Sequence, residues 1–207
     1  MKRKLSLLLL IIGCVSFMGR SFAQTNTLKQ ANRQFEMLAY MNAIELYEQA
    51  LKAKLSDAEK LQANLRLARS YMQVRDMTNA ERIYRDVVPR LNSPSGEELK
   101  SVLYYAQVLA SNGNNKESGK FWTMYDNLQK EDDQRGKAFA KLYGGDIDAL
   151  KKNSSKYIVD YLNINSGRAD FSPMYYKNGL VFCSGRGENE GLIKRVFSWD
   201  KSAFLDL

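Results

Sequence analysis

The stretch from Leu67 to Val87 limits what this chain can fold into more than any other part of it. Small residues stand at Ala68 and Ala80, and small residues let two antiparallel helices approach closely. Charged and polar residues interrupt the apolar rhythm at 75–78, which predicts a turn there. The large residues that fill the seam between the helices are Leu67, Tyr71, Tyr84 and Val87. The stretch therefore predicts a helical hairpin.

The same pattern recurs on both sides of this stretch. Ala43, Ala80 and Ser118 are equivalent positions, separated by 37 and 38 residues along the chain. Aromatic residues at helical spacing are interpreted as core rather than as a ligand-binding box. The predicted repeat core consists of Ala43, Tyr47, Ala68, Tyr71, Ala80, Tyr84, Ala106 and Trp122.

This pattern resembles the tetratricopeptide repeat, a helix–turn–helix unit of about 34 residues that stacks into a solenoid. The resemblance implies a helical domain at 24–152, with repeats at about 28–54, 57–91 and 96–129. A further helix at about 132–142, ended by Gly144 and Gly145, caps the last repeat, because a terminal repeat has one face to cover. The predicted helices are 28–38, 40–54, 57–74, 77–91, 96–111, 115–129, 132–142 and 146–152.

The first 23 residues have the organisation of a secretion signal. Three basic residues at 2–4 precede an apolar stretch at 5–15, and residues 21–23 form a small-x-small cleavage site. A membrane-spanning helix needs roughly 20 apolar residues, so a cleaved signal fits better. Residues 11–14 also resemble a lipoprotein box, which leaves lipidation of Cys14 as an alternative. We expect an exported chain, in the periplasm or at the periplasmic face of the outer membrane.

Composition excludes several classes of function. Without the basic residues of the signal, 27 basic residues face 23 acidic ones, and no basic run with interleaved aromatics predicts nucleic-acid binding. The absence of histidine removes the Ser–His and Cys–His nucleophile pairs and the commonest zinc ligand. We expect no enzyme activity, no catalytic residue, no metal site and no cofactor. Cys183 is interpreted as a small buried residue, with a reactive thiol as the alternative.

After residue 155 the pattern changes from helical to strand-like. Strands are predicted at 157–159, 161–162, 179–184 and 195–199, and the segment 177–179 is predicted to be the turn before the third of them. Gly185, Gly187 and Gly191 mark the loop that follows it. Residues 153–207 therefore form a second, β-rich segment.

Two motifs in this segment carry a second resemblance. Asp170-Phe171-Ser172-Pro173 and Ser184-Gly185-Arg186 flank an apolar strand, and Trp199 and Phe204 follow. Together they resemble the opening of a WD-like β-propeller. Signal peptide, tetratricopeptide repeats, propeller and a final OmpA-type domain occur in that order in a family of envelope proteins associated with type IX secretion and gliding motility. The resemblance implies an envelope assembly as the setting.

The chain also departs from that family. About one blade's worth of residues is present, whereas a propeller usually has at least four blades. No OmpA-type domain follows, so we expect a truncated or fragmentary member and no peptidoglycan binding. The remaining strands either pack on the helices as a small sheet or stay partly disordered, with open edges.

The first helix of each tetratricopeptide repeat lines a concave surface, and such a surface binds an extended peptide or a partner helix. Leu65 and Leu103 depart from the Lys/Asn set of the carboxylate-clamp subclass, so binding of chaperone tails is not expected. Ordinary solvated surface is the alternative for each position. The predicted groove residues are Asn32, Glu36, Gln62, Arg69, Gln73, Lys100, Gln107 and Ser111.

These observations predict an exported scaffold that holds protein partners in the bacterial envelope. The alternative is a module that binds a small ligand or a glycan through the propeller-like segment. An envelope hydrolase would need an acidic pair across a cleft, which the sequence does not indicate.

Overall fold

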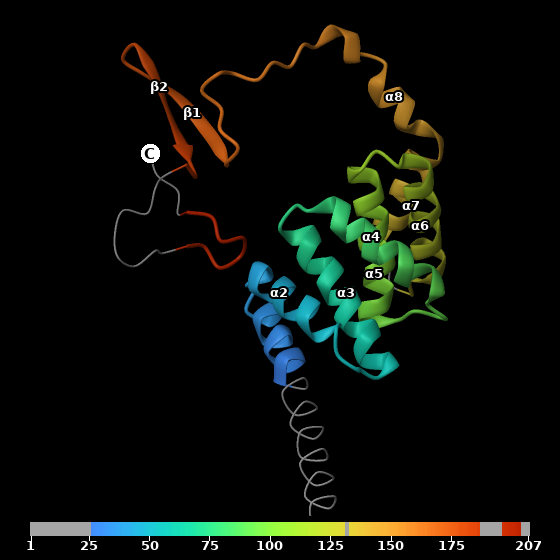
Figure 1. The fold of residues 1–207 in the computed structure, drawn as a ribbon. Helices are drawn as coiled ribbons and strands as arrows, with labels where there is room; N and C mark the ends of the chain where they lie inside the picture. The colour runs from blue at the N-terminus through green and yellow to red at the C-terminus, as the bar shows by residue number, and fades with distance from the viewer. Residues whose placement is uncertain (1–25, 131–132, 187–195, 204–207) are drawn as a thin grey trace, which may run out of the picture.

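The computed structural model describes residues 26–130, 133–186 and 196–203. This part of the chain is mainly helical and carries one two-stranded antiparallel sheet (Figure 1). Several predictions lie outside the described residues: the signal peptide at 1–23 with Cys14, the start of the capping helix at 132, the loop glycines Gly187 and Gly191, and Phe204.

The helices follow one another with short connections. Residues 26–36 are helical, and the predicted helix positions are confirmed to within four residues. The fourth helix was predicted to end at Leu91. It ends four residues earlier, at Val87, and the 3₁₀ turn Val88–Arg90 follows it. The helices after residue 36 are α2 (Tyr40–Ala50), α3 (Asp57–Gln73), α4 (Met77–Val87), α5 (Gly96–Ser111), α6 (Asn115–Leu128), α7 (Gln134–Lys141) and α8 (Ile147–Lys151).

Local sequence explains where α3 and α4 begin. Ser56 accepts a hydrogen bond from the Glu59 backbone N–H, and the Glu59 carboxylate accepts from the Ser56 backbone N–H, which forms a capping box. The Asp76 carboxylate accepts from the backbone N–H of Asn79 at the start of α4. In contrast, α2 follows Ala39, whose side chain cannot cap a helix.

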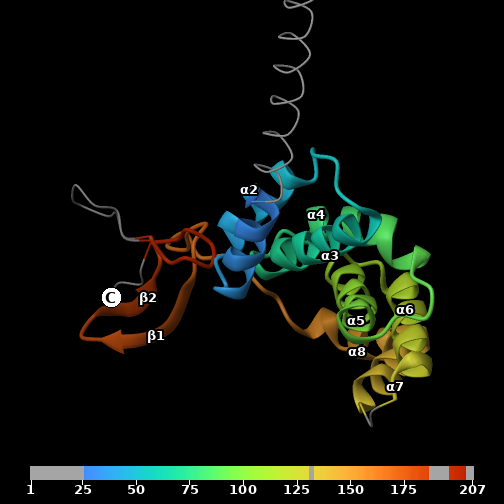
Figure 2. The same ribbon diagram turned by 90° about the horizontal axis from the view of Figure 1, so that it is seen from below.

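Consecutive helices pack against one another from α2 to α7, with α3 on α4 and α5 on α6 (Figures 1 and 2). All eight residues of the predicted repeat core are buried. Ser118 and Ala106 are fully buried and in direct contact between α6 and α5, because the Ser118 hydroxyl donates to the Ala106 carbonyl at 2.7 Å. The closeness of α5 and α6 therefore depends on a side chain no larger than serine at position 118.

Two buried tyrosines make a matched test of the core. The Tyr47 hydroxyl donates to Asn32 Oδ1 at 2.7 Å, whereas the Tyr84 hydroxyl has no partner among the described residues. Tyr47→Phe is therefore expected to lower the free energy of unfolding by about 0.5–1.5 kcal/mol. Tyr84→Phe removes an unpaired buried hydroxyl, so it should leave stability unchanged or raise it.

Urea unfolding of the two variants, followed by circular dichroism, measures this difference. Equal losses in both variants would contradict the assignment of the Tyr84 hydroxyl as unpaired.

Glu81 on α4 is a buried charge that the sequence pattern did not single out. Its carboxylate accepts from the Asn112 side-chain amide at 2.6 Å and from that of Asn114 at 3.3 Å, and it pairs with Arg85. Desolvation raises the pKa of Glu81, but these hydrogen bonds outweigh it and hold the pKa below its usual value. Glu81 thus ties the turn between α5 and α6 to α4.

The end of the helical part differs from the prediction. Gly144 and Gly145 do not end the helix, because the chain continues through a π-helical segment, Leu142–Asp146, into α8. Helix α7 lies close against α6: a Cβ at Gly136 would meet Asp126 Cβ at 2.9 Å. Phe139 of α7 stacks on Trp122 of α6 with ring centroids 4.7 Å apart.

The sheet consists of β1 (Asp170–Tyr176) and β2 (Gly179–Ser184), joined at Lys177 and Asn178. The strand at 179–184 and the turn before it are confirmed. The strands predicted at 157–159 and 161–162 are wrong, since those residues hold no strand and expose their apolar side chains. The strand predicted at 195–199 is reduced to a single bridge between Val196 and Ala203, and no described residues support a propeller blade of four strands.

The two sequence motifs of the hairpin meet at its base. Asp170 pairs with Ser184 in the strand register, and its carboxylate accepts from the Ser184 hydroxyl at 2.6 Å and from Arg186 at 2.8 Å. These two hydrogen bonds, with one from the Ser166 backbone N–H, lower the pKa of Asp170. Cys183 is half-buried rather than fully buried.

Candidate functional site

The surface formed by residues 26–36, α3 and α5 is called here the first-helix face. It carries the residues that the sequence analysis assigned to a groove. Two of those residues, Asn32 and Glu36, contact Arg66, a residue that the sequence analysis did not assign to the groove. Arg66 forms ion pairs with Glu36 at 3.1 Å and Glu97 at 3.2 Å, and it donates to Asn32 at 3.3 Å.

Arg66 therefore links all three helices of the first-helix face. Burial lowers the pKa of Arg66, but the Glu97 carboxylate and the Tyr47 hydroxyl together outweigh burial, so the net pKa is raised. A signal for Arg66 existed in the sequence, because it lies three residues before Arg69 and so on the same side of α3.

Arg69 forms a second cluster on this face. Its guanidinium lies 3.6 Å from the centroid of the Tyr104 ring of α5, a cation–π contact that the sequence analysis also missed. In the amide orientation of Gln73 that turns its side-chain oxygen towards Arg69, this oxygen accepts from Arg69 Nε and Nη2, each at 3.1 Å. Arg69 is thus held in place by α3 and α5 together.

The other predicted groove residues stand apart from these clusters. Gln62 is exposed, and the Ser111 hydroxyl bonds back to the Gln107 carbonyl of its own helix. Leu65 and Leu103 are buried in the core and so present no surface to a partner. The structure therefore brings Asn32 and Glu36 together at Arg66, and it brings Arg69 and Gln73 together in a second cluster. The remaining predicted groove residues, Gln62, Lys100, Gln107 and Ser111, belong to neither cluster.

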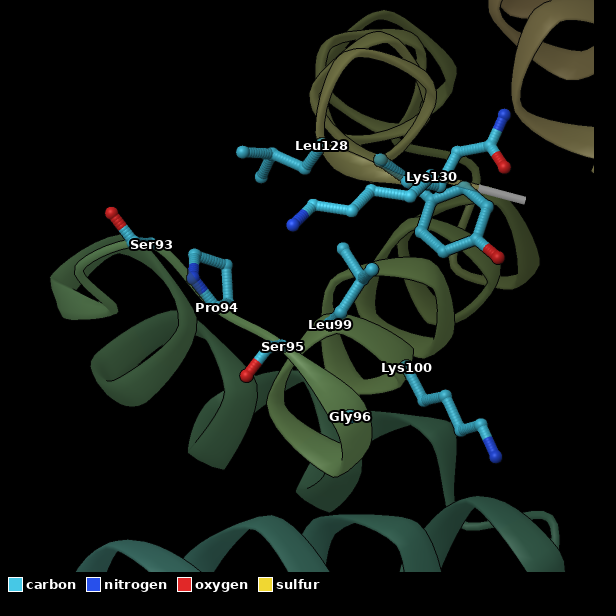
Figure 3. A pocket seen from close by; sticks show the side chains of 10 residues that line it. Ser93, Pro94, Ser95, Gly96, Leu99, Lys100, Leu128 and Lys130 are labelled. Atoms are coloured by element: carbon cyan, nitrogen blue, oxygen red, sulfur yellow. The ribbon is translucent and has the colours of Figure 1, made fainter.

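Lys100 lies beside a separate cavity of about 400 Å³ between the start of α5 and the end of α6. Figure 3 shows Pro94, Leu99 and Leu128 around this space, with Lys130 extending across it and Lys100 pointing away. The lining is mostly apolar, with no charged side chain held by a buried partner. The cavity is a seam between two packed helices rather than an organised ligand site.

A segment from the far end of the chain contacts the helices at α2 and at the end of α3. Residues 196–203, called here the Trp199 turn, form a tight turn in which Phe197 N–H donates to the Ser202 carbonyl at 2.8 Å and Lys201 N–H to the Phe197 carbonyl at 2.8 Å. Figures 1 and 2 both place this segment beside α2. One hydrogen bond of this segment joins Trp199 to Gln73, two residues that are 126 positions apart in the sequence.

Trp199 makes the contacts of this turn with the helices. Its ring stands edge-on to Tyr40 with centroids 4.7 Å apart, and its indole N–H donates to the Gln73 carbonyl at 2.9 Å. Its own carbonyl accepts from the Met41 N–H at 3.3 Å. Lys201 pairs with Glu45 at 2.5 Å. Desolvation is the main cause of the raised pKa of Tyr40, which lies at this junction.

A further cavity of about 690 Å³ lies between the hairpin and the Trp199 turn. Its lining includes Phe171 and Phe197 with Arg168 and Asp200. Aromatic faces beside hydrogen-bonding groups are features of small-molecule sites, and the volume is in their usual range.

Among residues 26–130, 133–186 and 196–203, no helix is both long and apolar enough to cross a membrane. Within the same ranges, no three Cys, Asp or Glu side chains are close enough together to hold a metal ion.

No family model matches the sequence, and neither a curated protein nor a solved structure is similar enough to count as a match.

Proposed function

We propose that this chain is a tetratricopeptide-type repeat protein that binds protein partners through the first-helix face. The repeat assignment is supported by three pairs of small residues, each pair twelve residues apart and each residue 0% exposed. These pairs are Ala31 with Ala43, Ala68 with Ala80, and Ala106 with Ser118. A constant spacing of small residues at helix crossings is what stacked helical hairpins require.

One observation carries the binding function: the helices already hold a short turn of non-helical chain. Trp199 uses its ring, its indole N–H and its backbone carbonyl on two helices at once. Aromatic anchors with a few well-placed hydrogen bonds are typical of the residues that dominate protein–protein binding. The surface that receives Trp199 lies on α2 and on the end of α3, where it adjoins the first-helix face, and it has the chemistry to receive a segment of another protein.

The proposed setting is the bacterial envelope, in or beside a secretion or gliding assembly. Its support is the secretion-type N-terminal sequence and the resemblance of the Asp170 and Ser184–Arg186 motifs to those of envelope propeller proteins. Hydrogen bonds from Ser184 and Arg186 to Asp170 hold the two motifs together at the base of the hairpin.

Affinity capture from solubilised envelope, with residues 24–207 as bait, tests the proposal. Arg69→Glu reverses a charge on the first-helix face, and Arg90→Glu makes the same change at an exposed site just after α4. We expect envelope proteins to be recovered by the unmodified bait and by Arg90→Glu, and recovery to fall at least tenfold with Arg69→Glu. Equal recovery by all three baits would place the contact elsewhere.

The cavity beside the hairpin supports a second candidate, binding of a small ligand or a glycan. Phe171 and Phe197 offer flat apolar faces, and Asp200 and Arg168 offer hydrogen-bonding groups. A thermal-shift screen of envelope saccharides against the unmodified chain and Phe171→Ala distinguishes this candidate. A shift that is seen only with the unmodified chain would favour it.

A further inference from the structure

Trp199 supplies a hydrogen-bond partner to one backbone group at each of two helix ends. The first N–H groups of a helix and its last carbonyls lack intrahelical acceptors and donors. Met41 is the second residue of α2, and the preceding Ala39 provides no side-chain cap. Gln73 is the last residue of α3. The Trp199 carbonyl accepts from the Met41 N–H at the start of α2, and the Trp199 indole N–H donates to the Gln73 carbonyl at the end of α3.

The receiving groups belong to the helices and not to the turn. Tyr40 and Met41 lie in the first turn of α2, Glu45 lies one turn later, and the Gln73 carbonyl lies at the end of α3. Tyr40 itself is packed against Phe35 with ring centroids 5.7 Å apart, so its ring is positioned by the first helix. These groups, called here the Trp199 receptor, are held by elements that pack without the turn.

The backbone geometry of the Trp199 turn fixes the directions in which its side chains point. Asp200 accepts from the Ser202 backbone N–H at 2.9 Å, and Lys201 has a φ of +60°, which folds the chain tightly after Trp199. Trp199 and Lys201 therefore face the same helix, where they meet Tyr40 and Glu45. The required ligand is a tight turn with tryptophan followed two residues later by lysine.

We propose that the Trp199 receptor is a binding site for a turn of this chemistry on another protein, and that the chain's own Trp199 turn occupies the site until such a partner displaces it. This inference rests on the proposed function and specifies both the contact and the kind of partner. Trp199 binds the backbone carbonyl of Gln73, whose side chain belongs to the Arg69 cluster, so the Trp199 turn contacts the first-helix face at one end.

Tethering explains why the site is closed in the isolated chain. A segment of the same chain is present at an effective concentration in the millimolar range, so a free partner must bind more tightly or be present in excess. Removal of the resident side chains should therefore expose the receptor to a weak ligand that the unmodified chain excludes.

The test uses the full chain with Trp199→Ala and Lys201→Ala, and a labelled cyclic peptide with the sequence of residues 196–203 as probe. Cyclisation is appropriate because Val196 and Ala203 pair in the turn. Fluorescence anisotropy should show at least tenfold tighter binding of the peptide to the double variant than to the unmodified chain. Binding should be lost when the tryptophan of the peptide is replaced by alanine.

Two receptor variants in the same background complete the test. Glu45→Lys reverses the charge of an exposed residue and so leaves the core intact, and Tyr40→Leu removes the ring but keeps apolar volume. Both variants are expected to weaken binding of the peptide by fivefold or more. Equal binding to the double variant and the unmodified chain, or no binding to either, would overturn the inference.

The capture experiment is independent of this result. If the peptide fails to bind but Arg69→Glu still abolishes recovery of envelope proteins, the proposed function stands without the Trp199 receptor. If the peptide binds as expected while capture is the same for all baits, the receptor is intact and the wider first-helix face is not the contact.

Discussion

Replacing Trp122 with alanine is expected to lower the free energy of unfolding by about 3–5 kcal/mol. Trp122 is the largest fully buried side chain of the described residues, and it carries the stack with Phe139 that holds α7 on α6. Truncation to alanine leaves a cavity between these helices that close packing at Gly136 prevents from collapsing. Chemical denaturation followed by circular dichroism measures the loss.

Trp199→Ala is the matched control for this prediction. Trp199 is only half-buried and lies in the turn that contacts the helices from outside. Its removal should cost about 1 kcal/mol or less, in line with the loss of a single net hydrogen bond. A larger loss from Trp199→Ala than from Trp122→Ala would mean that the turn, and not the α6–α7 contact, supports the helical part.

Replacing Glu81 with alanine is expected to cost about 1.5–3 kcal/mol, the usual range for hydrogen bonds to a charged group. The change leaves Asn112 and Asn114 without the carboxylate that anchors the turn before α6. Amide hydrogen exchange should therefore accelerate first at the 112–114 turn and the adjoining helix ends. Uniform acceleration over the whole chain would show that Glu81 stabilises the core generally.

The contribution of Glu81 should also depend on pH. Its pKa is held below that of an unfolded glutamate, about 4.3, so folding favours the ionised form. The stabilisation is therefore fully present above the unfolded pKa and is lost as the pH falls through the folded pKa. Comparison of the unmodified chain with Glu81→Gln between pH 7 and pH 3 should show the stability difference shrinking towards acid.

The helices were readable from the sequence because their signals are local. Ser56 and Glu59 mark the start of α3, and the spacing of Ala68 from Ala80 places the turn between α3 and α4. Neither depends on the rest of the chain. The error at Gly144 and Gly145 has the same origin, because glycine indicates a helix end only where packing does not support continuation.

The strands were harder to place. Residues 157–162 have strand-forming side chains, yet a strand forms only when a second strand supplies its hydrogen bonds. Of the predicted strands, only 179–184 finds a continuous partner among the described residues. That partner is Asp170–Tyr176, which the sequence analysis did not predict as a strand, and the two pair from the base of the hairpin at Asp170 and Ser184. Propensity alone therefore marked more strands than pairing allowed.

The sequence by itself determined that this chain forms packed helical pairs with small residues at their crossings, and it marked which faces are buried, because both depend on spacing within a few turns. Only the tertiary structure decided which polar groups of the first-helix face meet. Arg66 joins three helices, Arg69 stacks on Tyr104, and Trp199 reaches Gln73. These contacts join residues tens to more than a hundred positions apart, and no local pattern encodes such distances.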